Sequence, residues 1–201
     1  MKRTHEEHAA RFDEIADEYD DDKSEEYRAC VSLVVEAAAP GSEETVLDLG
    51  CGTGAVGLRL ADTADRVVGR DVSEGMMERA ERKADERGLT NVEFGKGTFR
   101  DPGIDDADVV VSNFAMHHLS DAEKREAFDV IAGLGPRRVV LGDVMFFGEP
   151  DPEEPFYSPA VDDPATVGVL ADALTDAGFA LVGVEMVHDQ VGVLVADRAA
   201  P

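Results

Sequence analysis

The chain has 201 residues, of which 44 are acidic and 19 basic, so its formal net charge is -25 at pH 7. This length suits one domain with a substantial core and is too short for two full ones. Such a charge offers no general attraction to nucleic acid or to anionic lipid, and we expect neither as a partner. Salt near 1 M shortens the Debye length to about 3 Å and screens the repulsion between like charges. The charge therefore favours a protein of a halophile's saline cytoplasm over an acidic protein of an ordinary cell.

Cysteine content and apolar runs exclude further classes. Cys30 and Cys51 are the only cysteines. They cannot form a disulfide framework or the three-cysteine iron–sulfur site of a radical enzyme. No apolar run approaches the roughly 18 residues of a membrane span, and the acidic N-terminal stretch lacks the apolar centre of a signal peptide. We therefore expect a cytoplasmic protein.

The first 44 residues predict a helical cap. Two helices are expected within residues 4–38, divided by the charged break at 19–24. Phe12, Ile15 and Tyr19 lie at helical spacing along the first helix. Pro40 and Gly41 end this segment.

Strands alternate with helices between residues 45 and 147. The expected strands are Thr45–Leu49, Arg66–Asp71, Val92–Phe94, Ala107–Ser112 and Arg137–Asp143, and the expected helices begin near Gly54, Glu74 and Asp121. Strands without polar alternation are typical of a parallel sheet covered on both faces. The pattern predicts a doubly wound α/β fold.

The remainder of the chain predicts a loop, a helix and a hairpin. Residues 148–165 carry five prolines and six acids, which predicts a loop without helix or strand that is able to act as a lid. A helix is expected over Thr166–Ala177, followed by two strands separated only by His188 and Asp189. Strands joined so tightly form an antiparallel hairpin. We expect a single domain over residues 1–201.

Three glycines at alternate positions follow the first predicted strand. Gly50, Gly52 and Gly54 precede a helix, so the backbone can approach a ligand and the helix N-terminus can face a carboxylate. Asp48, at the strand end, can receive an ammonium group. Together these groups match the amino-acid end of S-adenosylmethionine. Residues 52–57 also satisfy the G-x-G-x-x-G pattern of dinucleotide sites, but Asp48 would repel a pyrophosphate.

Asp71 ends the second predicted strand, about twenty residues beyond the glycine turn. A carboxylate there can accept hydrogen bonds from both ribose hydroxyls. The alternative is that Asp71 and Ser73 only cap the next helix. Met76, one turn into that helix, can touch the adenine, although a lone methionine is more often part of the core.

Several segments together resemble the class I S-adenosylmethionine-dependent methyltransferases, over about residues 8–197. They are DLGCGTG, VVGRDVS, the GTF segment, VVVSNFAMHHLSD, the opening FDEIADEYDD and the terminal hairpin. The resemblance implies a Rossmann-like seven-stranded sheet whose last strand is antiparallel, with S-adenosylmethionine as cofactor.

The resemblance also implies roles for particular residues. The implied cofactor contacts are Tyr19, Asp48, Gly50, Cys51, Gly52, Gly54, Asp71, Val72, Met76, Thr98, Phe99 and Asn113. Many relatives have aspartate where this chain has Thr98, which weakens the expected contact with the adenine amino group. Tyr27 and Arg28 are expected in the substrate pocket. The motif for methylating amide or adenine nitrogen is absent, since residues 112–115 read SNFA.

His117 and His118 are the candidate catalytic residues, because they follow the fourth strand at the mouth of the expected site. Methyl transfer from a sulfonium is an in-line displacement, so positioning dominates. A base is needed only when the acceptor arrives protonated, and histidine titrates in the right range. The alternative is a loop pair that only supports cofactor binding. Tyr157 and His188 can reach the same pocket, although structural roles are more common.

The histidine spacing predicts no metal site. The sequence as a whole predicts methyl transfer to a small-molecule acceptor. An S-adenosylmethionine-binding sensor or partner protein without catalysis is the alternative, and a dehydrogenase is a weaker third reading.

Overall fold

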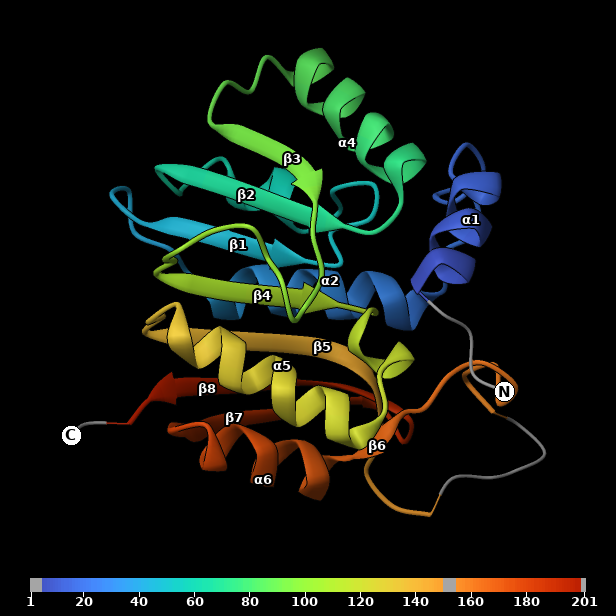
Figure 1. The fold of residues 1–201 in the computed structure, drawn as a ribbon, viewed down its shortest axis with the longest axis vertical. Helices are drawn as coiled ribbons and strands as arrows, with labels where there is room; N and C mark the ends of the chain where they lie inside the picture. The colour runs from blue at the N-terminus through green and yellow to red at the C-terminus, as the bar shows by residue number, and fades with distance from the viewer. Residues whose placement is uncertain (1–4, 150–154, 200–201) are drawn as a thin grey trace.

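The computed structural model describes residues 5–149 and 155–199 and shows one mixed sheet flanked by helices (Figure 1). The strands are β1 Thr45–Leu49, β2 Arg66–Asp71, β3 Val92–Lys96, β4 Val109–Asn113, β5 Arg138–Phe146, β6 Ala165–Thr166, β7 Phe179–His188 and β8 Val191–Arg198. The helices are α1 His5–Ile15, α2 Glu25–Ala38, α3 Gly57–Leu60, α4 Glu74–Arg87, α5 Asp121–Gly133 and α6 Val167–Asp176, with a short 3₁₀ helix, η1, at Met116–His118.

The strand order confirms the predicted fold class. The sheet runs β3-β2-β1-β4-β5-β8-β7, and the two-residue β6 pairs with β5 outside this path. Strands β1 to β5 are parallel, whereas β8 lies antiparallel to β5 and to β7. The order reverses between β1 and β4. In sheets of this kind ligands bind at that reversal, outside the carboxyl ends of the strands.

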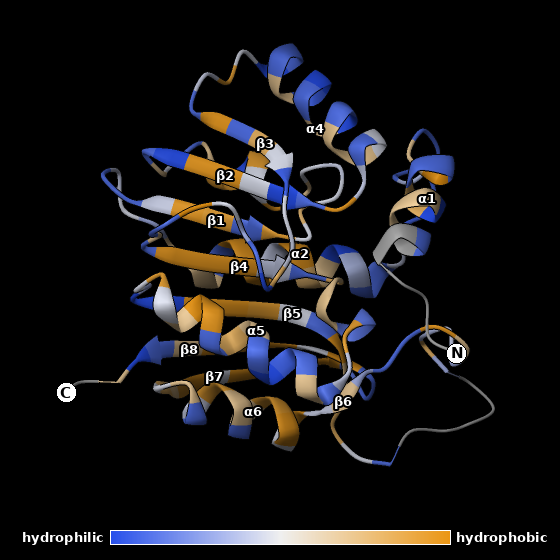
Figure 2. Cartoon of the chain, viewed as in Figure 1, coloured by the Kyte–Doolittle hydropathy of each residue, from blue (hydrophilic) through white to orange (hydrophobic). Residues whose placement is uncertain are grey.

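The core consists of two apolar layers, one on each face of the sheet. Along β4, Val109 and Val111 pack in the layer under α2 and α3, whereas Val110 packs in the layer under α5 and α6. Both faces of the central strands are therefore buried, which explains their continuous apolar sequence. Figure 2 shows hydrophobic residues along the central strands and hydrophilic residues on the outer faces of the helices.

Several predicted boundaries differ from the structure, most of them by one to three residues. The helix expected near Gly54 begins at Gly57, because Gly54 has a left-handed φ of 82° and belongs to the preceding turn. The loop expected over 148–165 has a strand at its end: β5 runs on to Phe146, and Ala165 pairs with Met145. Residues 150–154 of that loop lie outside the described residues. The hairpin forms as predicted, although its turn is residues 189–190.

Helix α1 lies at the carboxyl edge of the sheet beside α4 (Figure 1). The Asp13 carboxylate accepts hydrogen bonds from the Ser73 hydroxyl (2.6 Å) and the Gly75 N–H (2.9 Å), at the start of α4. The Asp20 carboxylate accepts from the Thr53 hydroxyl at 2.7 Å. These bonds hold the N-terminal cap over the glycine turn. Among the described residues no helix is long and apolar enough to span a membrane.

Candidate functional site

A cavity of about 220 Å³ lies at the carboxyl ends of β1, β2 and β4, under α1. Among the residues predicted to bind the cofactor or act in catalysis, those lining it are Tyr19, Gly50, Gly52, Asp71, Val72, Met76, Thr98, Phe99 and His118. Residues that line it without having been assigned a contact are Phe12, Gly97, Arg100, Phe114, Ala115, Leu119 and Glu123. Loops that follow β1 to β4 thus meet in one place, because parallel strands end at the same edge.

Gly50 and Gly52 share one reason to be glycine, and Gly50 has a second one. Both have left-handed backbone angles, with φ of 68° and 52°, which a Cβ disfavours. A Cβ on Gly50 would also lie 2.3 Å from the Cβ of Ala115. At Gly52 the nearest atom to such a Cβ would be a ring carbon of Tyr19, at 3.9 Å. A Cβ at Gly52 would therefore fill the gap between the turn and the Tyr19 ring at ordinary contact distance.

Asp71 joins the second strand to this turn. Its carboxylate accepts hydrogen bonds from the Gly52 N–H at 2.8 Å and from the Ser73 N–H at 2.9 Å. Burial raises the pKa of Asp71, and the backbone bonds lower it by less. The N-cap role in α4 belongs to Ser73, whose hydroxyl accepts from the Met76 N–H at 3.1 Å. A carboxylate has about four acceptor sites, so Asp71 keeps capacity for a ligand in the cavity.

Four of the predicted cofactor residues do not line the cavity: Asp48, Cys51, Gly54 and Asn113. Asp48 is buried beneath the turn, where it accepts from the Gly57 N–H at 2.9 Å, and burial raises its pKa to about 7. A Cβ on Gly54 would lie 2.8 Å from Leu58. Asp48 and Gly54 thus support the turn from below.

The turn of η1 carries the two predicted catalytic histidines. The His117 ring nitrogen Nδ1 lies 2.5 Å from the Asp143 carboxylate, which also accepts from the His117 N–H (3.0 Å) and the Val144 N–H (2.7 Å). Since this carboxylate is an acceptor only, Nδ1 carries the proton. Burial lowers the pKa of His117, but the charge of Asp143 and its hydrogen bond raise it by more.

His118 is paired with a different aspartate, Asp162, at 2.8 Å from Nδ1. Burial lowers the pKa of His118, and the bond to Asp162 opposes that shift only in part. The loop that carries Asp162 is fixed to η1, because the Asp163 N–H donates to the His117 carbonyl at 2.7 Å. The buried Lys124 ammonium also donates to the Asp163 carbonyl.

A second hollow of about 380 Å³ adjoins the first cavity. It is lined by Phe114, His117, Val144, Pro155, Phe156, Tyr157, Ser158 and Asp162. Phe114 lines both spaces and has a left-handed φ of 55°. Tyr157 lines this hollow. Tyr27 packs on the Phe114 ring, His188 packs on the Phe156 ring, and Arg28 is exposed.

Sequence comparison identifies the family to which this arrangement belongs. Residues 46–134 match the protein family described as methyltransferase domain. The uncharacterized methyltransferase YcgJ of Bacillus subtilis (strain 168) is 33% identical over 115 residues, which are 56% of this chain. Residues 46–134 therefore form a methyltransferase domain, and the fold is that of the class I S-adenosylmethionine-dependent methyltransferases. The aligned part is 46% of the length of YcgJ, so the match concerns a domain of that protein.

Solved structures of similar fold extend over most of this methyltransferase. Magnesium protoporphyrin IX methyltransferase from Synechocystis PCC 6803, with bound S-adenosylmethionine, has a TM-score of 0.68 and 23% identity, over 86% of this chain and 79% of the other. The [4+2]-cyclase SpnF has a TM-score of 0.81 and 17% identity, over 100% and 98% of the two chains. At these identities the likeness concerns the fold alone.

The first cavity of the methyltransferase fits the family's cofactor. The glycine turn gives backbone access, Asp71 offers a carboxylate, and the apolar side chains of Val72, Met76 and Phe99 form a wall suited to an adenine ring. The Thr98 hydroxyl accepts from the Asp101 N–H at 3.0 Å, within its own loop.

The sequence patterns did not indicate the two aspartates that pair with the histidines, Asp143 and Asp162. Asp143 follows an apolar run in β5, much as Asp48 and Asp71 follow apolar runs in β1 and β2, so that pattern could have indicated it, although β5 itself continues to Phe146. Asp162 lies in a proline-rich loop, and no local pattern places it against His118.

Proposed function

We propose that this methyltransferase transfers a methyl group from S-adenosylmethionine to a small-molecule acceptor. One observation carries the proposal: two adjoining hollows share Phe114, and the η1 turn presents His118 to the first and His117 to the second. The cofactor would occupy the first hollow and the acceptor the second. When bound, S-adenosylmethionine supplies a methyl group already activated on a sulfonium.

The residues that would hold the cofactor follow from the cavity walls. Asp71 would accept from the ribose hydroxyls, and Gly50 and Gly52 would let the backbone approach the methionine part. Tyr19 covers the turn, and burial raises its pKa to about 12, so its hydroxyl stays protonated and can donate. Val72, Met76, Thr98 and Phe99 would surround the adenine. Asp48, Cys51, Gly54 and Asn113 would act from behind the cavity wall.

The second hollow suits a small, partly planar acceptor. Its aromatic walls come from Phe114, Phe156 and Tyr157, and its polar side from His117 and Asp162. Aromatic walls with a few convergent polar groups are typical of small-molecule sites. The net charge of -25 opposes nucleic acid as the acceptor.

His117 and His118 are the proposed catalytic residues. An in-line displacement requires the acceptor atom and the methyl carbon to be held on one axis, so most of the rate comes from positioning. The aspartates behind each ring, Asp143 and Asp162, hold the two imidazoles in place. We propose that the pair orients the acceptor and assists loss of its proton.

Calorimetric titration with S-adenosylmethionine and S-adenosylhomocysteine in multimolar KCl tests the first half of the proposal. Saturable binding is expected, with loss of at least tenfold in affinity for Asp71→Ala. Asp105→Ala, which removes an exposed carboxylate, is the matched control and should bind normally. Absence of binding by the folded chain would refute the proposal. Release of S-adenosylhomocysteine with a panel of small phenols, amines and acids then tests transfer.

A further inference from the structure

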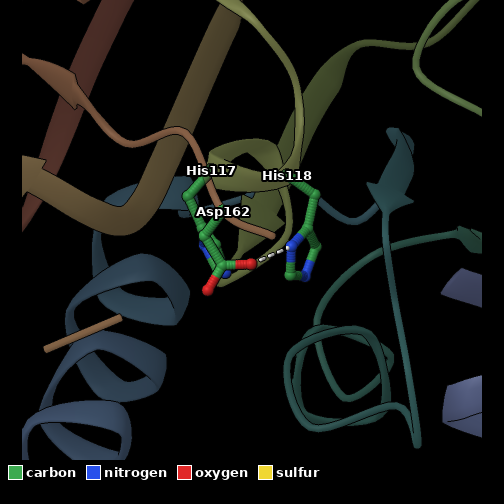
Figure 3. Close-up of side chains that lie close together, drawn as sticks. All are labelled: His117, His118 and Asp162. Atoms are coloured by element: carbon green, nitrogen blue, oxygen red, sulfur yellow. Dashed lines mark hydrogen bonds and ion pairs between the residues drawn. The ribbon is translucent and has the colours of Figure 1, made fainter. Parts of the chain in front are cut away.

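Two histidines and an aspartate from distant parts of the chain converge between the two hollows (Figure 3). His117 and His118 are neighbours in η1, with ring centroids 4.1 Å apart. Asp162 comes from the loop before β6 and lies against both rings. One nitrogen or oxygen atom of each side chain lies within 4.8 Å of those of the other two.

We propose that His117, His118 and Asp162 bind a divalent first-row transition-metal ion, for which Zn²⁺ is the reference. Two imidazole nitrogens and one carboxylate oxygen form a donor set that such ions favour. Mg²⁺ and Ca²⁺ prefer oxygen ligands throughout and are expected to bind poorly. Three protein ligands leave a position open, as in catalytic rather than structural metal sites.

The hydrogen bond of Asp143 to His117 is a second, independent observation in favour of this site. Metal-binding histidines commonly donate one ring N–H to a carboxylate, which fixes the ring and leaves the other nitrogen for the ion. Asp143 is buried, and two backbone N–H groups hold its carboxylate in place. Its bond to His117 Nδ1 directs Nε2 toward the ion.

The separation of His118 and Asp162 is slightly shorter than that of two ligands of one ion, so a small outward movement of either side chain would admit an ion. His118 Nδ1 and Asp162 Oδ1 are 2.8 Å apart. Two atoms that each lie about 2.0–2.1 Å from an ion stand about 2.9–3.4 Å apart. The ion would replace the proton between them, and the imidazole proton would move to Nε2. The Ser158 N–H donates to the other Asp162 oxygen at 2.8 Å, so that carboxylate is already oriented.

The position of the site indicates the class of acceptor, an inference that rests on the proposed function. His118 lines the cofactor cavity, whereas His117 and Asp162 line the second hollow. An ion held between them would coordinate an acceptor hydroxyl and lower its pKa, so that its proton leaves to water. The expected acceptors are therefore small molecules with a metal-binding hydroxyl, and the two imidazoles act on them through the ion.

Metal uptake is measured directly on tag-free chain that has been treated with a chelator and dialysed into metal-free KCl buffer. Calorimetry with Zn²⁺ should show one saturable site, and Co²⁺ should give visible absorption bands from nitrogen and oxygen ligands. His117→Ala and Asp162→Asn should each lose at least tenfold in affinity. Asp143→Asn should also lose about 10–100-fold, although it leaves all three ligands in place, because it removes the partner that orients the His117 ring.

His188→Ala is the matched control, because His188 also pairs with an aspartate, Asp189, at 2.6 Å but lies outside the cluster. It should bind Zn²⁺ with unchanged affinity. Asp162→Asn keeps an acceptor for Ser158, so this variant remains informative if His117→Ala does not fold. No saturable uptake, or equal losses in His188→Ala and Asp162→Asn, would overturn the proposal.

Titration of the same samples with S-adenosylhomocysteine separates this inference from the proposed function. Cofactor binding without metal uptake overturns the metal site alone. Metal uptake without cofactor binding supports the metal site and contradicts the proposed function. Asp71→Ala should keep its metal affinity while losing the cofactor.

Discussion

Alanine at Gly50 and alanine at Gly52 should differ in cost, and the difference comes from one packing contact. Both positions have left-handed φ angles, which cost a residue with a Cβ about 1–2 kcal/mol. At Gly50 the new Cβ would lie 2.3 Å from the Ala115 Cβ, well inside the usual contact of about 3.5–4.0 Å. Overpacking of this kind adds about 1–3 kcal/mol.

We therefore expect Gly50→Ala to lower the free energy of unfolding by about 2–5 kcal/mol and Gly52→Ala by about 1–2 kcal/mol. Urea unfolding in KCl, followed by circular dichroism, measures both values. Adding Ala115→Gly to Gly50→Ala should recover part of the loss, because it removes the opposing Cβ. Equal losses at the two glycines, or no recovery in the double variant, would refute the packing argument.

Four further measurements test other features of the fold. Asp48→Asn should flatten the dependence of the unfolding free energy on pH. Burial raises the pKa of Asp48 in the folded chain from 3.8 to about 7, so between these two values the folded chain holds a proton that the unfolded chain releases. The wild type therefore loses stability as the pH rises from about 4 to about 7. Phe128→Ala should cost about 3–5 kcal/mol in urea unfolding, because Phe128 is fully buried between α5 and the sheet. Raising the KCl concentration from about 0.2 M to about 2 M should raise the midpoint temperature of thermal unfolding, because the repulsion within a chain of net charge -25 is then screened. Lys124→Met should increase protease cleavage between residues 155 and 164, since the Lys124 ammonium ties that loop to α5.

Each of these has an outcome that contradicts it. An unchanged pH slope in Asp48→Asn would mean that another group titrates. A cost below about 1 kcal/mol for Phe128→Ala would mean that the cavity collapses. A midpoint that falls with KCl would contradict a repulsive charge, and an unchanged cleavage rate in Lys124→Met would mean that other contacts fix the loop.

The sequence predicts the central strands of this fold well, because their apolar runs coincide with the segments that are buried in the sheet. The strands β1 and β2 begin and end where predicted, since Gly50 follows β1 at once and β2 ends at Asp71, two residues before the Ser73 cap of α4. The start of α3 was misplaced, because a glycine that follows a strand can belong to a turn or to a helix. β6 was missed, because two residues carry no periodicity and pair only where β5 happens to extend.

The sequence predicts which loops form the candidate site. It does not predict which of their side chains point into the cavity. Asp71 and Asp48 both end parallel strands, yet Asp71 lines the cavity and Asp48 lies beneath the turn. Side-chain direction at a strand end depends on the local register, and the motif does not encode it. The convergence of Asp162 on His118 depends on the path of a loop held by backbone contacts.

The position of β8 has a consequence for the order in which this chain is able to fold. Although β8 follows every other strand in sequence, it lies inside the sheet, between β5 and β7. On a ribosome, β1 to β5 can pair before β8 is synthesised, and β5 is then an uncovered edge. An uncovered parallel edge is a template for aggregation. The negative charge of the chain would make nascent copies repel one another during that interval. The same charge thus destabilises the folded chain and protects the partly folded chain from aggregation.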